Sequence, residues 1–235
     1  MGFEIYQPTW GVQHPIRGVL FDMDGLVMDT EKLYSRFWRE ALHYYGYEMT
    51  LEQALTMRGL GGQAGEAMLH RYFGPDANYL QLRSKRIELM DAFVEENGVE
   101  LKPGIRELLD YLDKEQIPSA ITSSSPILRI RKYLSQHGLD TRFHALCSGR
   151  DVPHGKPAPD IYLTGAAAIG IPPQECLALE DAPAGILSAF RAGCLTAMIP
   201  DQDQPGEETT ALLYARADSL ADIIDLLETG LRKAV

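Results

Sequence analysis

Short apolar runs alternate with helix-like stretches along the second half of the chain, and this alternation most strongly limits its fold. Helices are predicted near residues 105–114, 126–137, 159–170 and 184–192. Strands are predicted at 17–21 and near residues 118–122, 144–147, 176–179 and 196–199. Strands separated by helices are joined as parallel neighbours through right-handed crossovers. The sequence therefore predicts an α/β fold built on a doubly wound parallel sheet.

A long helical block interrupts this pattern after the first strand. Residues 31–98 carry apolar side chains at three-and-four spacing, with breaks at Gly46, at Gly59-Leu60-Gly61-Gly62 and at Gly74-Pro75. The block is too long to be a loop of a compact domain, so we interpret it as an inserted helical domain. The expected organisation is an N-terminal extension at 1–15, an α/β core at 16–30 plus 100–235, and a helical domain at 31–99.

Charge and composition exclude several classes of protein. Of the 235 residues, 33 are acidic and 22 are Lys or Arg, so the formal charge is −11. Binding through a general attraction to nucleic acid or to an anionic membrane is therefore not expected. The apolar runs are far shorter than the roughly 18 to 20 residues that span a bilayer, and no signal-peptide pattern opens the chain, which predicts a soluble, cytoplasmic protein. Three widely separated cysteines favour buried reduced thiols over a disulfide framework or a zinc site.

Chemically active side chains follow the ends of the predicted strands. In open α/β sheets, ligands bind outside the carboxyl ends of the strands, so these side chains are candidates for one site. They are Asp22, Asp24, Thr122, Ser123, Ser124, Ser125, Glu180 and Asp181, with Lys156 in a loop. Crowded carboxylates require a cation, and hard oxygen ligands favour Mg²⁺, which commonly shares its coordination with a substrate phosphate. The cluster therefore predicts phosphoryl chemistry.

Each residue type suits one part of that chemistry. A carboxylate such as Asp22 can attack phosphorus and form an aspartyl-phosphate, and Asp24 can then act as the acid and base. Ser125-Pro126 is typical of an N-cap followed by the first residue of a helix, which would aim free N–H groups at a phosphate near Ser123. Lys156 supplies a compact positive charge.

Four motifs in this order resemble the haloacid dehalogenase-like (HAD) hydrolase superfamily, in particular its β-phosphoglucomutase-like phosphatase branch with a helical cap. The motifs are Asp22-Met23-Asp24-Gly25-Leu26-Val27-Met28-Asp29-Thr30-Glu31, Ile121-Thr122-Ser123-Ser124-Ser125, His154-Gly155-Lys156-Pro157-Ala158-Pro159-Asp160 and Glu180-Asp181-Ala182-Pro183-Ala184-Gly185. The resemblance covers nearly the whole chain after Pro15. It implies a Rossmann-like core whose inserted helical domain is a cap that closes over the substrate.

The resemblance also implies individual roles. Asp22 would be the nucleophile and a Mg²⁺ ligand, and Asp24 would be the acid and base and would bind the metal through its backbone carbonyl. Ser123 and Lys156 would hold the phosphoryl group. Glu180 and Asp181 would complete the metal site.

Departures from the mutases of this branch favour a phosphatase. Those mutases carry a histidine four residues after the threonine that corresponds to Thr30, where this chain has Tyr34. They also carry a cap arginine whose equivalent falls in Arg58-Gly59-Leu60-Gly61-Gly62, where Gly62 offers no charge. Tyr34 and Trp38 are spaced i, i+4, for which helix packing is the favoured interpretation. The candidate substrate-binding residues are Ser124, Ser125, Thr30, Tyr34, Arg58, Gly61 and Gly62.

The predicted function is a Mg²⁺-dependent phosphatase that hydrolyses a small sugar phosphate or nucleoside monophosphate. The expected partner is a small phosphorylated metabolite, with no nucleic acid and no membrane, and the expected state is a monomer or weak homodimer. A sugar phosphate mutase is the alternative within the same fold. A phosphorylatable, non-catalytic signalling module is the alternative from another class, although such a switch needs neither Asp24 nor a cap.

Overall fold

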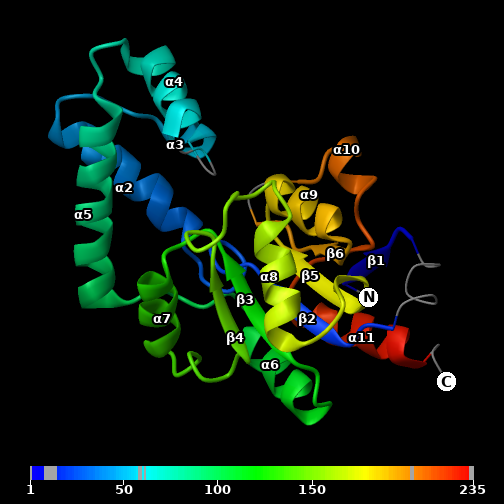
Figure 1. Cartoon of the computed structure of the whole chain (residues 1–235). Coiled ribbons are helices and arrows are strands. Elements are labelled where there is room, and N and C mark those ends of the chain that lie inside the picture. Colours follow the sequence, from blue (N-terminus) through cyan, green and yellow to red (C-terminus); the bar gives the residue numbers. More distant parts are fainter. Residues whose placement is uncertain (1, 8–14, 58–59, 61, 202–203, 233–235) are drawn as a thin grey trace. The chain divides into compact units, whose positions relative to one another are not determined.

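The chain forms two compact units (Figure 1). The computed structural model describes residues 2–7, 15–57, 60, 62–201 and 204–232. The first unit contains the chain up to Met28 together with the chain from Leu101 onward, and the second is Asp29–Glu100, which spans the helical block expected at 31–99. The two units are described separately below.

A mostly parallel sheet forms the centre of the first unit, which confirms the predicted α/β fold. The order across the sheet is β1 (Phe3–Ile5), β7 (Ala215–Ala217), β6 (Leu195–Met198), β5 (Cys176–Glu180), β2 (Gly18–Phe21), β3 (Ser119–Ser123) and β4 (Ala145–Ser148). Only the edge pair of β1 and β7 is antiparallel among these strands. The sequence did not predict β1 or β7, and β1 lies in the segment expected to be an extension.

Helices connect the parallel strands and cover the sheet. They are α6 (Ile105–Lys114), α7 (Ile127–Ser135), α8 (Asp160–Ile169), η1 (Pro173–Glu175), α9 (Pro183–Ala192), α10 (Glu207–Thr210) and α11 (Asp222–Arg232). Helices α8 and α9 lie together over one face (Figure 1). Leu20, Ala120 and Ala178 pack there in one core cluster with Tyr162 and Ala189. Because side chains alternate along a strand, the neighbouring apolar residues face the opposite side of the sheet.

The connections place a topological switch point between β2 and β5. From β2 the chain continues to β3 and β4 on one side, and from β5 it continues to β6 and β7 on the other. Strands β2 and β5 are hydrogen-bonded parallel neighbours, with Phe21 paired to Leu179. A crevice outside the carboxyl ends of such a strand pair is the usual position of a ligand site in this architecture.

Among the described residues of the second unit, the regular elements are all helices. Its helices are α2 (Glu31–Tyr44), α3 (Leu51–Thr56), α4 (Gly62–Phe73) and α5 (Tyr79–Asn97). Trp38 is buried and stacks on Tyr79 with 6.1 Å between ring centroids, which supports the packing interpretation of Trp38. Gly46 and Gly74 have positive φ angles of 83° and 86° and follow α2 and α4, so these two of the three predicted breaks are present. The third, at Gly59-Leu60-Gly61-Gly62, includes Gly59 and Gly61, which lie outside the described residues. No described helix in either unit is long and apolar enough to cross a membrane.

Candidate active site

Three buried carboxylates meet at the carboxyl ends of β2 and β5. Asp22 directly follows β2, and its backbone N–H donates a 3.0 Å hydrogen bond to the carbonyl of Leu179. Glu180 is the last residue of β5 and Asp181 is the next residue. One carboxylate oxygen from each of Asp22, Glu180 and Asp181 lies within 4.8 Å of the others. The pairing of β2 with β5 therefore brings the backbones of these three residues together.

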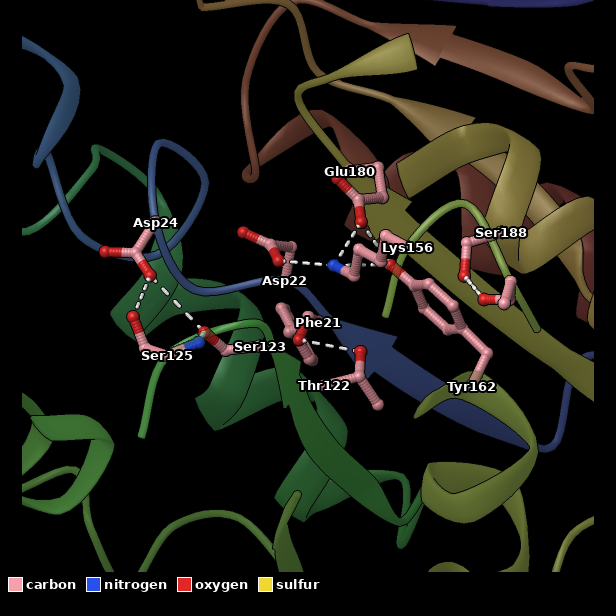
Figure 2. A network of polar contacts seen from close by, with 11 residues as sticks. Phe21, Asp22, Asp24, Thr122, Ser123, Ser125, Lys156, Tyr162, Glu180 and Ser188 are labelled. Atoms are coloured by element: carbon pink, nitrogen blue, oxygen red, sulfur yellow. Dashed lines mark hydrogen bonds and ion pairs between the residues drawn. The ribbon is translucent and has the colours of Figure 1, made fainter. Parts of the chain in front are cut away.

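Lys156 bridges two of these carboxylates. Its Nζ lies 2.5 Å from Asp22 Oδ1 and 2.6 Å from Glu180 Oε1, and its side chain is only 10% exposed (Figure 2). The neighbouring loop is attached to α9, because Ser188 Oγ donates to the Ala158 carbonyl at 2.5 Å. Arg191 Nη1 donates to the Pro157 carbonyl at 3.0 Å. These two contacts fix the loop that carries the lysine ammonium.

Asp24 contacts two serines rather than the acidic cluster. Ser123 Oγ donates to Asp24 Oδ2 at 3.3 Å, and Ser125 Oγ donates to the same oxygen at 2.8 Å. The backbone N–H of Ser125 donates to Ser123 Oγ at 3.0 Å. Figure 2 draws this group on one side of Asp22 and Lys156 on the other. The Asp24 carboxylate is therefore positioned by hydroxyl groups, and its predicted backbone contact to a metal stays a prediction.

The loop after β3 is held by the end of β4. Ser148 Oγ donates to the Ser125 carbonyl at 2.9 Å, and the N–H of Gly149 donates to the Ser123 carbonyl at 2.7 Å. The prediction that Ser125 caps the following helix is wrong. Pro126 occupies the N-cap position of α7, and Ile127 is the first helical residue. The Ser125 hydroxyl instead donates a hydrogen bond to the Asp24 carboxylate.

Tyr162 is a site residue that the sequence reasoning missed. This residue of α8 is fully buried, and its hydroxyl donates to Glu180 Oε1 at 2.5 Å. It lies six residues after Lys156. In the sequence, a tyrosine in an otherwise mostly apolar helical segment was the feature that could have pointed to it. Ser188, Arg191 and Ser148 were also missed, because side-chain bonds to distant carbonyls have no local sequence pattern.

Burial and charge change the protonation of the cluster. Desolvation raises the pKa of Asp22 to about 8; Lys156 opposes this shift, while Glu180 and Asp24 add to it. Burial by itself would lower the pKa of Lys156, but the attraction of Asp22 and Glu180 raises it overall, so the ammonium stays charged. Burial and the negative charge of Glu180 raise the pKa of Tyr162, which keeps its hydroxyl protonated as a donor.

This donor set fits a hard divalent cation. Asp22, Glu180 and Asp181 offer only carboxylate oxygens, and Lys156 supplies one positive charge beside Asp22 and Glu180. Lys156 donates to Asp22 Oδ1, and both Lys156 and Tyr162 donate to Glu180 Oε1. Among the described residues no hydrogen bond reaches the other carboxylate oxygens, Asp22 Oδ2 and Glu180 Oε2. Oxygen-only ligands of this kind suit Mg²⁺.

The structure brings most of the predicted core residues together. Those gathered at the carboxyl edge are Asp22, Asp24, Ser123, Ser125, Lys156, Glu180 and Asp181. Ser124 is exposed in the loop after β3. Thr30, Tyr34 and Gly62 belong to the second unit, and Arg58 and Gly61 lie outside the described residues. The substrate-binding role of these last six residues stays a prediction.

Gly185 in α9 leaves room for the Glu180 carboxylate, and replacing it is expected to disturb the cluster. A Cβ atom at Gly185 would overlap the carboxyl carbon and both oxygens of Glu180. We expect Gly185→Ala to weaken Mg²⁺ binding measured by calorimetry and to lower the free energy of unfolding by about 1 to 3 kcal/mol, the usual cost of overpacking. Gly206→Ala is the control, because a Cβ there meets nothing within 4 Å. Unchanged Mg²⁺ affinity in Gly185→Ala would contradict this expectation.

Comparison with known proteins identifies the family of this chain. Residues 19–199 match the family model described as haloacid dehalogenase-like hydrolase. Hexitol phosphatase A of Escherichia coli is 36% identical over 180 residues, covering 76% of this chain and 80% of that protein. A Drosophila melanogaster protein named probable pseudouridine-5′-phosphatase is 33% identical over 212 residues, covering 86% and 89%.

A solved structure extends the comparison to the fold. The HAD family hydrolase from Deinococcus radiodurans, with bound phosphate and sodium, superimposes with a TM-score of 0.75 at 28% identity, covering 92% of this chain and 97% of that one. The resemblance of the four motifs is therefore confirmed at the level of the whole chain. The chain belongs to the haloacid dehalogenase-like hydrolase family, and its named relatives place it among the phosphatases of that family.

Proposed function

We propose that this protein is a Mg²⁺-dependent phosphatase that hydrolyses a small phosphate monoester through an aspartyl-phosphate at Asp22. One observation carries the proposal. The Asp22 carboxylate lies between the Lys156 ammonium, 2.5 Å away, and the Asp24 side chain. It also belongs to the cluster of three carboxylates. A nucleophile, a proton carrier and positive charge are thus available at one sheet edge.

Two displacements at phosphorus account for hydrolysis. In the first, an oxygen of Asp22 forms a bond to phosphorus, the bond from phosphorus to the leaving oxygen breaks, and Asp24 gives that oxygen a proton. In the second, Asp24 takes a proton from water as the water oxygen bonds to phosphorus, and the bond to Asp22 breaks. Asp24 ends with the proton it began with, and Asp22 is released unchanged.

The remaining residues orient the phosphoryl group and balance its negative charge during these steps. The hydroxyl groups of Ser123 and Ser125 donate to Asp24, and either could exchange that hydrogen bond for one to a phosphoryl oxygen when a substrate binds. Lys156 balances negative charge on the phosphoryl group and on Asp22. Mg²⁺ held by Asp22, Glu180 and Asp181 would supply further positive charge and would lower the pKa of Asp22 from its raised value.

The relatives and the predicted cap support a proposal for the substrate class. The two named relatives are a hexitol phosphatase and a pseudouridine phosphatase, and the Deinococcus hydrolase holds phosphate. These names support a sugar phosphate or a nucleoside 5′-monophosphate as substrate. We assign the second unit, Asp29–Glu100, as the cap that selects among them, with Thr30, Tyr34, Arg58, Gly61 and Gly62 as its candidate contacts.

Release of inorganic phosphate tests the proposed function. We expect the 235-residue chain to hydrolyse an aryl phosphate and at least one member of a panel of sugar phosphates and nucleoside monophosphates. Chelation of divalent cations should remove the activity, and Mg²⁺ should restore it. No phosphate release from any compound would refute the proposal, and bisphosphate-dependent isomerisation without phosphate release would indicate a mutase instead.

A further inference from the structure

Tyr162 lies within the acidic cluster but outside the residues given a role above. It is the third residue of α8, and it is fully buried in the cluster of Leu20, Ala178 and Ala189. Packing alone explains an aromatic ring at this position. It does not explain a phenolic hydroxyl, because burying that group costs free energy unless it finds a partner.

The partner of that hydroxyl is the Glu180 carboxylate. Tyr162 donates to Glu180 Oε1 at 2.5 Å, and Lys156 Nζ donates to the same oxygen at 2.6 Å. Lys156 Nζ also lies 3.5 Å from the Tyr162 hydroxyl and 5.1 Å from the centre of its ring (Figure 2). Tyr162 therefore contacts both Glu180, a member of the acidic cluster, and Lys156, which bridges Glu180 to Asp22.

Two donors on one oxygen orient the whole carboxylate. With Oε1 bonded to Tyr162 and Lys156, rotation of the Glu180 carboxylate would break a hydrogen bond. Gly185 packs closely against the same carboxylate and further limits its movement. Among the described residues no hydrogen bond reaches Oε2, so this oxygen remains available to a cation held with Asp22 and Asp181.

We propose that Tyr162 is a positioning residue that holds the Glu180 carboxylate in the orientation that binds Mg²⁺. This inference rests on the proposed function and adds to it a residue that sets metal affinity without touching the metal or the substrate. Its hydroxyl holds Glu180 Oε1 toward the Lys156 ammonium. Glu180 Oε2 is then left to bind the cation. The aromatic ring keeps Lys156 near Asp22 by packing.

The test is a calorimetric titration of the metal-free 235-residue chain with Mg²⁺ in the absence of substrate. Tyr162→Phe removes the hydroxyl and keeps the buried ring, so the fold is expected to persist. We expect its Mg²⁺ dissociation constant to rise about 10-fold or more, as is typical when a residue that orients a metal ligand is lost. Tyr214→Phe is the matched control, because Tyr214 is a buried tyrosine, 2% exposed, next to β7 and outside the site. It should bind Mg²⁺ as the wild type does.

The Mg²⁺ dependence of kcat is a second measurement. It would not change if the Tyr162 hydroxyl only stabilised the fold. The Tyr162→Phe variant should lose activity at low Mg²⁺ and regain most of the wild-type kcat when Mg²⁺ is raised about 10-fold or more, with KM for the substrate little changed. A Mg²⁺ dissociation constant within twofold of wild type, an equal loss in Tyr214→Phe, or a kcat that added Mg²⁺ does not restore would each overturn the inference while the proposed function stands. A wild-type protein that neither binds Mg²⁺ nor releases phosphate would overturn both.

Discussion

Asp22→Asn is expected to reduce phosphate release by on the order of 10⁴-fold or more, because an amide cannot form the bond to phosphorus that starts the reaction. The rate should be measured at saturating Mg²⁺ on the best compound of the panel. Asp218→Asn is a suitable control, because Asp218 is exposed, follows β7 and pairs with Arg216. It should keep the wild-type rate. Activity of Asp22→Asn within about 10-fold of wild type would exclude Asp22 as the nucleophile.

The same substitution should stabilise the metal-free protein at neutral and alkaline pH. The pKa of Asp22 is raised from 3.8 to about 8 in the folded state, so the folded protein binds this proton more tightly than the unfolded chain does. The contribution of Asp22 to stability therefore falls as the pH rises from about 4 to about 8, and an asparagine does not share this loss.

Chemical unfolding in the presence of a chelator checks this expectation. The free energy of unfolding of Asp22→Asn should exceed that of wild type most at pH values above about 8, and the difference should shrink toward zero near pH 4. Added Mg²⁺ should reduce the advantage of the variant, because the ion stabilises only a protein that keeps its carboxylate. A variant that is less stable than wild type across the whole range would contradict the raised pKa.

Asp24→Asn is expected to slow turnover of an alkyl phosphate by about 10²- to 10⁴-fold, the usual contribution of a general acid and base. The size of the effect should depend on the leaving group. A sugar alkoxide needs a proton as it departs, whereas an acidic phenolate does not. The first step on an aryl phosphate should therefore suffer less than the first step on a sugar phosphate.

A stoichiometric burst would identify the second role of Asp24. With an aryl phosphate, the Asp24→Asn variant should release about one phenolate per enzyme quickly and then turn over slowly, because water attack on the aspartyl-phosphate lacks its base. Rapid mixing followed by detection of the phenolate measures both phases. Asp22→Asn should show no burst. An equal loss on both substrates with no burst would show that Asp24 acts only by holding Ser123 and Ser125 in place.

Much of the first unit could be predicted because its signals are local. The strand at Gly18–Phe21 and the helices from Ile105 and Pro183 follow runs of apolar residues with clear breaks, and their predicted ends differ from the structure by only a few residues. The short strands at Phe3–Ile5 and Ala215–Ala217 were not predicted. Each has three residues, and each becomes a strand only by pairing with a distant part of the chain.

Asp201 shows the same limit for side chains. It begins a polar stretch of sequence, which by composition favours exposure to solvent, yet Asp201 pairs with Lys102 at 2.7 Å, and the two side chains are 11% and 19% exposed. The partner lies 99 positions away along the chain. No local pattern could have predicted this contact.

The sequence by itself determined the order of the central parallel strands and their connecting helices, the family and the residues that can carry phosphoryl chemistry. Asp22, Asp24, Ser123, Lys156, Glu180 and Asp181 stand in motifs whose meaning depends on residue type and spacing, so they could be found without coordinates. The tertiary structure decided which oxygen faces which donor. The pairing of Asp24 with two serines and the bond from Tyr162 to Glu180 join separate segments, and the direction of a buried side chain depends on packing among all of them.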